Sequence, residues 1–299
     1  MFKRKKIGLA LGGGGARGLA HIGVIKILED YKIPIDMIAG TSMGAVIGAL
    51  YCSESNAKKL AKESIAFNWK DLFDYTISKK GLIKGEKIED FLEQKLDEIK
   101  FNELKIPLFV TAFDLDQKRE LVFSKGSVAK AVRASISIPG IFIPVQNKGE
   151  IIVDGGVTDI IPTEALRKAG ADIIIAVNVD SVKEKCTLYG QKADSRKTNK
   201  KIPNFLNTLT RSLQIVEAEA CKSEILNEKA DLVISINLEK IGTFDFSKAK
   251  QAIKKGERKA RSSIEEIKKL AEPNIFKEFL EGLEKELNLK KVIKEVRKI

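Results

Sequence analysis

A serine lies between two glycines in the pentapeptide Gly-Thr-Ser-Met-Gly at residues 40–44. The pentapeptide follows an apolar run and precedes a helical pattern, the setting in which a tight turn exposes a serine hydroxyl as a nucleophile. Gly40 and Gly44 supply the small neighbours that such a turn requires, and the N–H of Met43 is placed to donate to an oxyanion. The pattern therefore predicts acyl transfer to Ser42, with a simple helix cap at that serine as the alternative.

Four consecutive glycines begin the segment Gly-Gly-Gly-Gly-Ala-Arg-Gly at residues 12–18, between an apolar run and a helical pattern. Glycines let backbone N–H groups face an anion at the positive end of the following helix, so the segment predicts an anion cradle. It also fits a dinucleotide fingerprint through Gly13, Gly15 and Gly18. That fingerprint requires an acidic residue at the end of the next strand, whereas Asp36 begins it. A glycine turn that only allows close packing is the third interpretation.

Asp154, Gly155 and Gly156 follow another apolar run. A carboxylate at the end of a strand can lie on the same sheet edge as Ser42, and the two glycines let the chain turn away without covering it. An ordinary Asp-Gly turn is the alternative interpretation. Three further aspartates also follow predicted strands and are more simply loop residues: Asp114, Asp116 and Asp180.

His21 is the only histidine of the 299-residue chain, so a Ser-His-Asp mechanism would have to use it. It falls in an apolar helical pattern, which favours a structural histidine over one that approaches Ser42. A carboxylate can act as the general base in place of histidine. Three cysteines without CxxC spacing favour neither a disulfide framework nor a metal site, so we expect a reducing, cytoplasmic compartment, no metal and no cofactor.

Alternating apolar runs and helical periodicities must position these motifs. We predict strands over residues 7–11, 35–39, 108–113, 121–123, 151–153, 173–179 and 232–236. We predict helices over residues 17–31, 42–52, 57–67, 86–96, 127–137, 205–226, 249–270 and 275–299. Strands that alternate with helices in this way predict an α/β fold whose mostly parallel central sheet is covered on both faces.

The positive charge is concentrated in two segments: the net charge is +12, and residues 183–201 and 246–299 carry the whole excess. We expect a solvated loop at 183–201. Since no linker is recognisable, we predict one domain over residues 1–299, with its motifs in a core at about 7–180 and a helical extension at 246–299. No apolar stretch is long enough for a membrane helix, and we recognise neither an export signal nor a nucleic-acid-binding motif.

The motifs resemble those of the patatin-like phospholipases. The resemblance includes Ala-Ser at residues 134–135 and Pro-Gly-x-Phe-x-Pro at residues 139–144, and it extends over about residues 7–179 in order and spacing. It implies a three-layer α/β/α sandwich and acyl-ester hydrolysis by a Ser-Asp dyad, with Ser42 as nucleophile and Asp154 as base. Around this dyad we expect oxyanion donors at Gly13, Gly14, Gly15 and Met43, and supporting residues at Arg17, Gly18, Gly40, Gly44, Gly155 and Gly156.

These observations predict a serine esterase or phospholipase that cleaves lipid acyl esters through an acyl-enzyme intermediate. A catalytically idle adaptor at the membrane surface is a second hypothesis, because the basic residues at 183–201 and 246–299 would attract anionic lipid. The amphipathic helix at 275–299 would otherwise pack against the core. A dinucleotide-binding module is the weakest alternative. The apolar segment at 139–144 is either core or the wall of an acyl groove.

Overall fold

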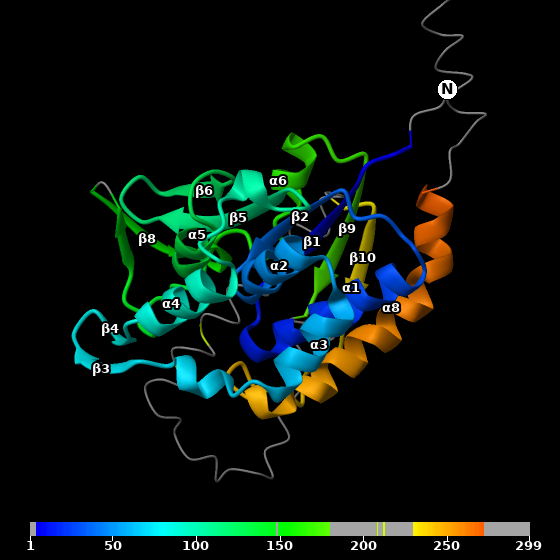
Figure 1. The fold of residues 1–299 in the computed structure, drawn as a ribbon. Helices are drawn as coiled ribbons and strands as arrows, with labels where there is room; N and C mark the ends of the chain where they lie inside the picture. The colour runs from blue at the N-terminus through cyan, green and yellow to red at the C-terminus, as the bar shows by residue number, and fades with distance from the viewer. Residues whose placement is uncertain (1–3, 148, 180–207, 209–211, 213–229, 272–299) are drawn as a thin grey trace, which may run out of the picture.

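A central sheet crosses the molecule in the strand order β10-β9-β1-β2-β5-β8-β7, with β6 paired to β5 (Figure 1). The computed structural model describes residues 4–147, 149–179, 208, 212 and 230–271. The strands of this sheet are β1 (Ile7–Leu11), β2 (Met37–Thr41), β5 (Leu108–Asp114), β6 (Arg119–Phe123), β7 (Val145–Asn147), β8 (Glu150–Asp154), β9 (Ile173–Asn178) and β10 (Leu232–Ser235). A separate hairpin consists of β3 (Tyr75–Ser78) and β4 (Gly81–Ile83).

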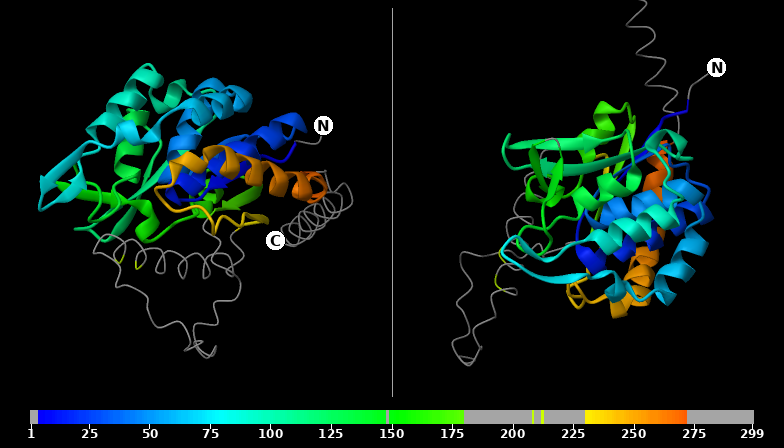
Figure 2. Two further views of the ribbon diagram at one scale, coloured as in Figure 1. Left: turned by 90° about the horizontal axis from the view of Figure 1, so that it is seen from below. Right: turned by 60° about the vertical axis from the view of Figure 1, so that its left-hand side comes forward.

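Helices cover both faces of the sheet, as Figure 2 shows from two further directions. The α-helices are α1 (Ala20–Asp30), α2 (Met43–Glu54), α3 (Ala57–Ala66), α4 (Glu86–Lys95), α5 (Val128–Ser135), α6 (Thr163–Lys168) and α8 (Ala249–Ala271). Short 3-10 helices are η1 (Gly15–Leu19), η2 (Trp69–Leu72), η3 (Phe101–Glu103), η4 (Gly155–Val157) and η5 (Phe246–Lys248). The arrangement is the three-layer α/β/α fold that the sequence predicts.

Each strand divides its side chains between two cores because successive residues of a strand point to opposite faces. In β1, Leu9 and Leu11 pack in the larger core with α1, α2, α5 and α8, whereas Ala10 packs in the smaller core with α6. The five residues of β1 are all buried, which explains why the strand is a continuous apolar run rather than an alternating one.

The sheet combines a parallel part with an antiparallel part. Strands β10, β9, β1, β2 and β5 are parallel, whereas β6 and β8 are antiparallel to β5, and β7 is antiparallel to β8. Val110 and Thr111 pair with both β2 and β6, so these two strands flank β5 on opposite sides. Residues 112–114 pair with both β6 and β8. Strand β8 therefore lies on the same side of β5 as β2, beyond the end of β2.

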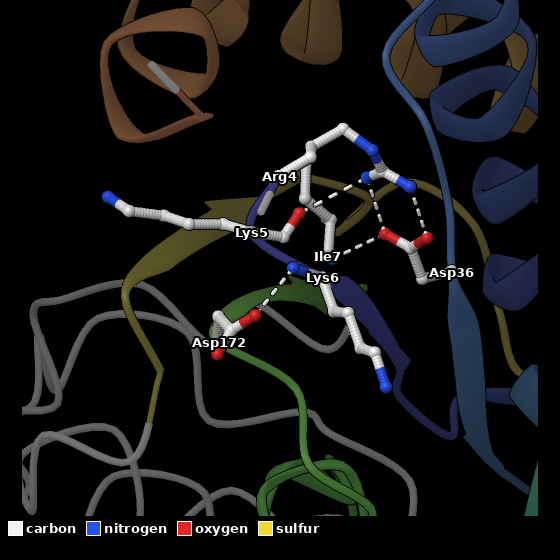
Figure 3. Close-up of polar contacts among 6 residues, drawn as sticks. All are labelled: Arg4, Lys5, Lys6, Ile7, Asp36 and Asp172. Atoms are coloured by element: carbon white, nitrogen blue, oxygen red, sulfur yellow. Dashed lines mark hydrogen bonds and ion pairs between the residues drawn. The ribbon is translucent and has the colours of Figure 1, made fainter. Parts of the chain in front are cut away.

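Polar contacts fix the start of β1 between its two neighbours, at the amino ends of the parallel strands (Figure 3). The guanidinium of Arg4 binds both carboxylate oxygens of Asp36, with one N···O distance of 2.8 Å, and these bonds lower the pKa of Asp36. The N–H of Ile7 donates to Asp36, and the N–H of Lys6 donates to Asp172, each at 2.7 Å. Because these hydrogen bonds hold the Asp36 carboxylate at this edge, it does not bind a ligand at the opposite edge, where the glycine segment lies.

Most predicted elements are confirmed, with shifts at their ends. The strand predicted at 35–39 begins two residues later, and the helix predicted at 127–137 is shorter at its C-terminal end. The loop predicted at 183–201 and the helices predicted at 205–226 and 275–299 lie outside the described residues. Four elements were not predicted from the sequence: β3, β4, β7 and α6. Within the described residues, every helix is too short or too polar to cross a lipid bilayer.

Candidate active site

Ser42 occupies a strained turn between β2 and α2. Its φ is 54° and its ψ is −122°, a conformation that non-glycine residues rarely adopt and that occurs mostly at functional sites. A Cβ at Gly40 would come within 2.6 Å of the backbone of Gly44 and Ala45, and a Cβ at Gly44 would lie 2.0 Å from the carbonyl oxygen of Leu11. Both glycines are therefore required by close backbone packing, as the nucleophile-elbow interpretation predicts.

Ser42 receives support from a residue whose role the sequence did not reveal. Its backbone N–H donates to the hydroxyl oxygen of Ser135 at 2.8 Å, and both groups are buried. On β2, the hydroxyl of Thr41 lies 2.7 Å from that of Thr111 and donates to the carbonyl of Asp159 at 3.0 Å. The Ala-Ser pair at 134–135 was visible in the sequence as part of the family resemblance, but only the fold brings it to the nucleophile.

The carboxylate of Asp154 lies beside the hydroxyl of Ser42. Burial raises the pKa of Asp154 to about 6, while hydrogen bonds from the Gly156 N–H, at 2.8 Å, and from the Ser42 side chain oppose that rise. The backbone N–H of Asp154 donates to the carbonyl of Ser137. A Cβ at Gly155 would lie 2.9 Å from Thr111, so the turn after Asp154 packs directly on β5. The sequence motif therefore marks a residue that touches Ser42.

The glycine segment runs along the other side of Ser42. Gly14 and Gly15 have φ values of 146° and 56°, which favour glycine. The N–H of Gly13 donates to the carbonyl of Ile160 at 3.0 Å, whereas among the described residues no acceptor binds the N–H of Gly14 or Gly15. The N–H of Met43 is the first of α2, so no carbonyl within that helix can accept it. Three N–H groups around Ser42 are thus available to an anion, and that of Gly13 is already engaged.

Arg17 ties the glycine segment to the chain that follows β10. Its guanidinium donates to the carbonyl of Gly14 at 3.4 Å and to the hydroxyl of Thr243 at 3.3 Å. The N–H of Ala16 donates to the carbonyl of Thr243 at 2.7 Å. A Cβ at Gly18 would meet the side chain of Met43 at 2.5 Å. Arg17 thus holds the segment against the chain that follows β10, and Gly18 leaves space for the Met43 side chain.

His21 is a structural histidine, as its apolar setting predicts. It is buried, its Nε2 lies 2.7 Å from the carbonyl oxygen of Gly12, and its Nδ1 has no hydrogen-bond partner among the described residues. Burial lowers the pKa of His21 to about 4, so the ring is neutral near pH 7 and its Nε2 donates to Gly12. The one histidine thus positions the glycine segment.

The two other candidate carboxylates that the structure describes lie at a turn rather than beside the serine. Asp114 is buried and accepts the N–H groups of Asp116 and Gln117, so it stabilises the turn between β5 and β6. Asp116 belongs to that turn, and Asp180 lies outside the described residues. Within the described part of the chain, no three His, Cys, Asp or Glu side chains gather as a metal site.

An apolar pocket opens from Ser42. Gly15, Ser42 and Met43 are among the residues that line it. Half of the remaining lining is aromatic and half is aliphatic, and the rings come from four separate parts of the chain: Trp69, Phe73, Phe91, Phe142, Phe244 and Phe246. The segment at 139–144 serves both interpretations, since Ile141 is buried in the larger core and Phe142 also lines the pocket. No sequence pattern indicates Phe244 and Phe246, because they lie some 200 residues beyond Ser42 in the chain.

The sheet is mostly parallel, and a serine occupies the tight turn between a strand and a helix at its carboxyl edge. This arrangement is that of an α/β fold with a nucleophile elbow. A family model of patatin-like phospholipases matches residues 9–167, more than half of the chain, and the chain belongs to this family. The crystal structure of VipD from Legionella pneumophila has the same fold: its TM-score is 0.55 at 15% identity, with 87% of this chain and 67% of that chain covered.

Relatives of this chain include longer proteins. Lysophospholipase nte1 of Aspergillus fumigatus is 34% identical over 185 residues, which are 60% of this chain and 12% of that protein. Neuropathy target esterase sws of Drosophila melanogaster is 33% identical over 183 residues, 58% of this chain and 13% of that protein. An uncharacterized NTE family protein of Mycobacterium bovis is 37% identical over 181 residues, with 58% and 49% covered. The chain therefore matches at most about half the length of these relatives.

Proposed function

We propose that this protein is a serine acyl-ester hydrolase of the phospholipase type, with Ser42 as nucleophile and Asp154 as general base. The observation that carries the proposal is the approach of these two side chains, close enough for the Ser42 hydroxyl to favour the ionised form of Asp154, with Ser42 itself lining an apolar pocket. Membership of the patatin-like family supports lipid esters as the substrate class. Two relatives are named as a lysophospholipase and an esterase, which agrees with that class.

In the first half of the reaction, the oxygen of Ser42 attacks the ester carbonyl carbon while Asp154 accepts the serine proton. The carbonyl oxygen becomes an oxyanion, and the N–H groups of Gly14, Gly15 and Met43 are the donors available to it. The tetrahedral intermediate then expels the alcohol, which takes the proton from Asp154. The acyl group remains on Ser42 as an ester.

In the second half, a water molecule attacks the acyl-enzyme and gives one proton to Asp154. The same N–H groups bind the second oxyanion. Collapse of this intermediate breaks the bond to the serine oxygen, which recovers the proton from Asp154, and a fatty acid is released. The enzyme returns to its starting state without a metal or a redox partner.

The environment of Asp154 suits it to this task. Its pKa of about 6 lies near the working pH, so the group is largely ionised at pH 7 and is a stronger base than an exposed carboxylate. Burial is the main cause of the raised value, and the Gly156 N–H keeps the carboxylate oriented. His21, whose pKa is about 4 and whose donor is bound to Gly12, has no such role in the proposal.

The pocket indicates which part of the substrate it binds. Its aromatic wall, which includes Trp69 stacked on Phe246 at 5.7 Å between ring centroids, offers no charge to a headgroup. We infer that it holds the acyl chain, since burial of methylene groups is favourable by about 0.8 kcal/mol each. The polar alcohol part of the ester would then point away from the aromatic wall.

Labelling with a fluorophosphonate ester probe tests the proposal. The probe should modify Ser42, because only an activated serine attacks phosphorus at neutral pH, and peptide mapping identifies the residue. Labelling should disappear in Ser42→Ala and become much slower in Asp154→Asn. Ser53→Ala is the matched control, since Ser53 lies on the same helix and its hydroxyl only donates to the carbonyl of Leu50. A folded protein that reacts elsewhere, or that ignores the probe, would contradict the mechanism.

A further inference from the structure

The hairpin of β3 and β4 projects from the body of the molecule (Figures 1 and 2). Its apolar side chains are exposed. Tyr75 is 74% exposed and Ile77 is fully exposed, and Leu82 on the second strand is also exposed. Proteins usually keep large apolar residues out of water where they gather on one small element, so a cluster of this kind marks a contact surface. Nothing among the described residues covers Ile77.

The same hairpin is cationic. Between residues 75 and 84 the chain has three lysines, Lys79, Lys80 and Lys84, and no acidic residue. Lys79 and Lys80 are exposed at the turn between the two strands. Asp74, at the base, is turned inward, where its carboxylate accepts the N–H groups of residues 85, 86 and 87 at the start of α4. Lys84 is offset by Glu86 at 3.7 Å, so the uncompensated charge is at the tip.

The base of the hairpin is fixed to the wall of the active-site pocket. The N–H groups of Leu82 and Ile83 both donate to the carbonyl of Ile141 at 2.9 Å, and the N–H of Ile143 donates to the carbonyl of Ile83 at 2.9 Å. The buried guanidinium of Arg133 binds the carbonyls of Lys84 and Ile143. A rigid connection therefore links the exposed tip to the segment that contains Phe142, a pocket residue.

Ring contacts continue this connection on the first strand. Tyr75 packs edge-on against Phe73 at 6.2 Å between ring centroids, and Phe73 packs edge-on against Phe244 at 6.3 Å. Phe73 and Phe244 both line the pocket. The apolar surface of the hairpin is thus continuous, through Phe73, with the apolar wall of the pocket.

We propose that the β3–β4 hairpin anchors the protein to a lipid bilayer that carries anionic headgroups. Tyr75 and Ile77 enter the interfacial region, where an aromatic ring with a polar tip is favourable, and Lys79 and Lys80 contact lipid phosphates. The combination of exposed apolar and cationic groups on one short hairpin fits an anionic bilayer better than it fits a purely apolar or a purely acidic groove of a protein. The use of the anchor, to bring the Ser42 pocket next to acyl chains, rests on the proposed function; the anchor itself does not.

Vesicle sedimentation tests the anchor without any reference to catalysis. The full chain is mixed with vesicles of phosphatidylcholine and phosphatidylglycerol, or of phosphatidylcholine alone. Ile77→Ser should weaken binding roughly tenfold, as expected for the loss of one inserted apolar side chain. Lys79→Gln with Lys80→Gln should weaken it roughly fivefold per lysine, on the anionic vesicles only. Ile65→Ser on α3, where the isoleucine is also exposed, is the matched control and should bind like the wild type.

A tryptophan on the hairpin reports directly on insertion. The chain has a single tryptophan, Trp69, which lines the pocket proposed for the acyl chain, so Trp69→Phe removes its signal first. In this background the emission of Tyr75→Trp should shift to the blue on anionic vesicles and be quenched by brominated acyl chains, whereas the emission of Ile65→Trp should change little. If Tyr75→Trp binds vesicles without either change, or if Ile77→Ser binds as tightly as Ile65→Ser, the hairpin is not the anchor. Absence of wild-type binding to anionic vesicles at low salt would also overturn the proposal.

Two esters separate the anchor from the proposed hydrolysis. On a soluble short-chain p-nitrophenyl ester, Ile77→Ser should retain the wild-type rate, since Ile77 lies outside the pocket. On a phospholipid in anionic vesicles, its rate should fall in proportion to its weaker binding. Loss of both activities in the wild type would refute the hydrolase while leaving the vesicle-binding result to decide the anchor. Equal rates of Ile77→Ser and wild type on vesicles, with unequal binding, would show that the contact does not serve catalysis.

Discussion

Strands β2 and β8 approach the candidate site from opposite directions along the same side of β5. Strand β2 ends with Thr41 paired to Thr111, and β8 ends with Asp154 paired to Ala112, the next residue of β5. The two carboxyl ends therefore meet head-on, and Ser42 and Asp154 become neighbours through one residue step on a third strand. In an all-parallel sheet a strand at the place of β8 would have its carboxyl end far from Ser42.

The two ends of this junction are built differently. Around Ser42, backbone packs against backbone, and added atoms at Gly40 or Gly44 would overlap main-chain atoms. Around Asp154, hydrogen bonds to the Gly156 N–H and the Ser42 side chain compensate a buried charge, and its pKa stays raised. Steric packing thus determines the position of the nucleophile, whereas electrostatics determines the basicity of Asp154. Substitutions should distinguish the two.

The largest effect is expected from Ser42→Ala. Removal of the only attacking oxygen should lower kcat for a p-nitrophenyl ester by on the order of 10⁶-fold. The melting temperature should hardly change, because the backbone N–H of residue 42 still donates to Ser135. Circular dichroism melts check the fold, and Ser53→Ala serves again as the control. Hydrolysis at the native rate by folded Ser42→Ala would exclude this serine as the nucleophile.

Asp154→Asn is expected to lower kcat/KM by roughly 10² to 10⁴-fold, because the amide keeps the shape and loses the proton acceptor. In the wild type, kcat/KM should rise with pH through about 6 and then level off, since the carboxylate must be ionised to accept the proton. Asp114→Asn is the matched control, a buried aspartate on the adjacent strand that holds a turn. A larger loss in Asp114→Asn than in Asp154→Asn would invalidate the assignment of the base.

Gly14→Ala should lower kcat by roughly 10² to 10³-fold if its N–H stabilises the oxyanion. The new methyl would lie 2.9 Å from the Val179 side chain, and the φ of 146° is strained for alanine, so the N–H must move. Gly126→Ala is the control for strain alone, because Gly126 has a φ of 82° and open space around it. A loss of activity no greater than the loss of folded protein would support a purely structural turn.

The charge on Asp154 should also reduce stability, by about 2 to 3 kcal/mol at most. Folding raises its pKa from 3.8 to about 6, so the folded protein binds this proton more tightly than the unfolded chain. The protonated carboxyl group of Asp154 therefore contributes its full stabilisation below about pH 4, and this stabilisation is lost as the pH rises through 6. Urea unfolding should show that the free energy of unfolding of Asp154→Asn, measured relative to the wild type, is larger at pH 8 than at pH 4 by this amount. An unchanged difference between the two pH values would mean that the carboxylate is not destabilised by burial.

His21→Asn should have the smallest effect, less than about tenfold on kcat/KM, because the ring only holds the Gly12 carbonyl. The pH profile should keep its rise near pH 6, since His21 is neutral above about pH 4. Stopped-flow or plate-reader rates between pH 5 and pH 8 are sufficient for this comparison. A profile that loses its rise in His21→Asn would identify the histidine as the titrating group.

Sequence reasoning worked best where function needs a local backbone geometry. Gly15, Gly40 and Gly44 leave a signature because neighbouring backbone would exclude a side chain at each of these positions. The motif that begins with Asp154 was found, but the antiparallel direction of its strand was not, because strand pairing depends on distant residues. Ser135 also acts through a contact with a residue distant in the chain, so the sequence alone did not indicate its role.

The short hairpin and the pocket wall could not be predicted. The first hairpin strand, Tyr-Thr-Ile-Ser, alternates apolar and polar residues, but four residues are the shortest run in which alternation indicates a strand, and the second strand has only three residues. The pocket depends on tertiary packing of rings from η2, α4, the 139–144 segment and the chain after β10. The local sequence does not indicate which of these distant rings pack together.

The order of strands in the sheet has a consequence for the synthesis of the chain. Strand β1 lies between β2 and β9, and Ile7 pairs with Ile173, so its second edge stays open until the ribosome has made β9. The clamp of Ala16 and Arg17 on Thr243 forms later still. Because long-range pairings of this kind close last, the glycine segment reaches its final position only after Thr243 has emerged from the ribosome. On the proposed function, a nascent chain is therefore unable to cleave an ester before that point of its synthesis.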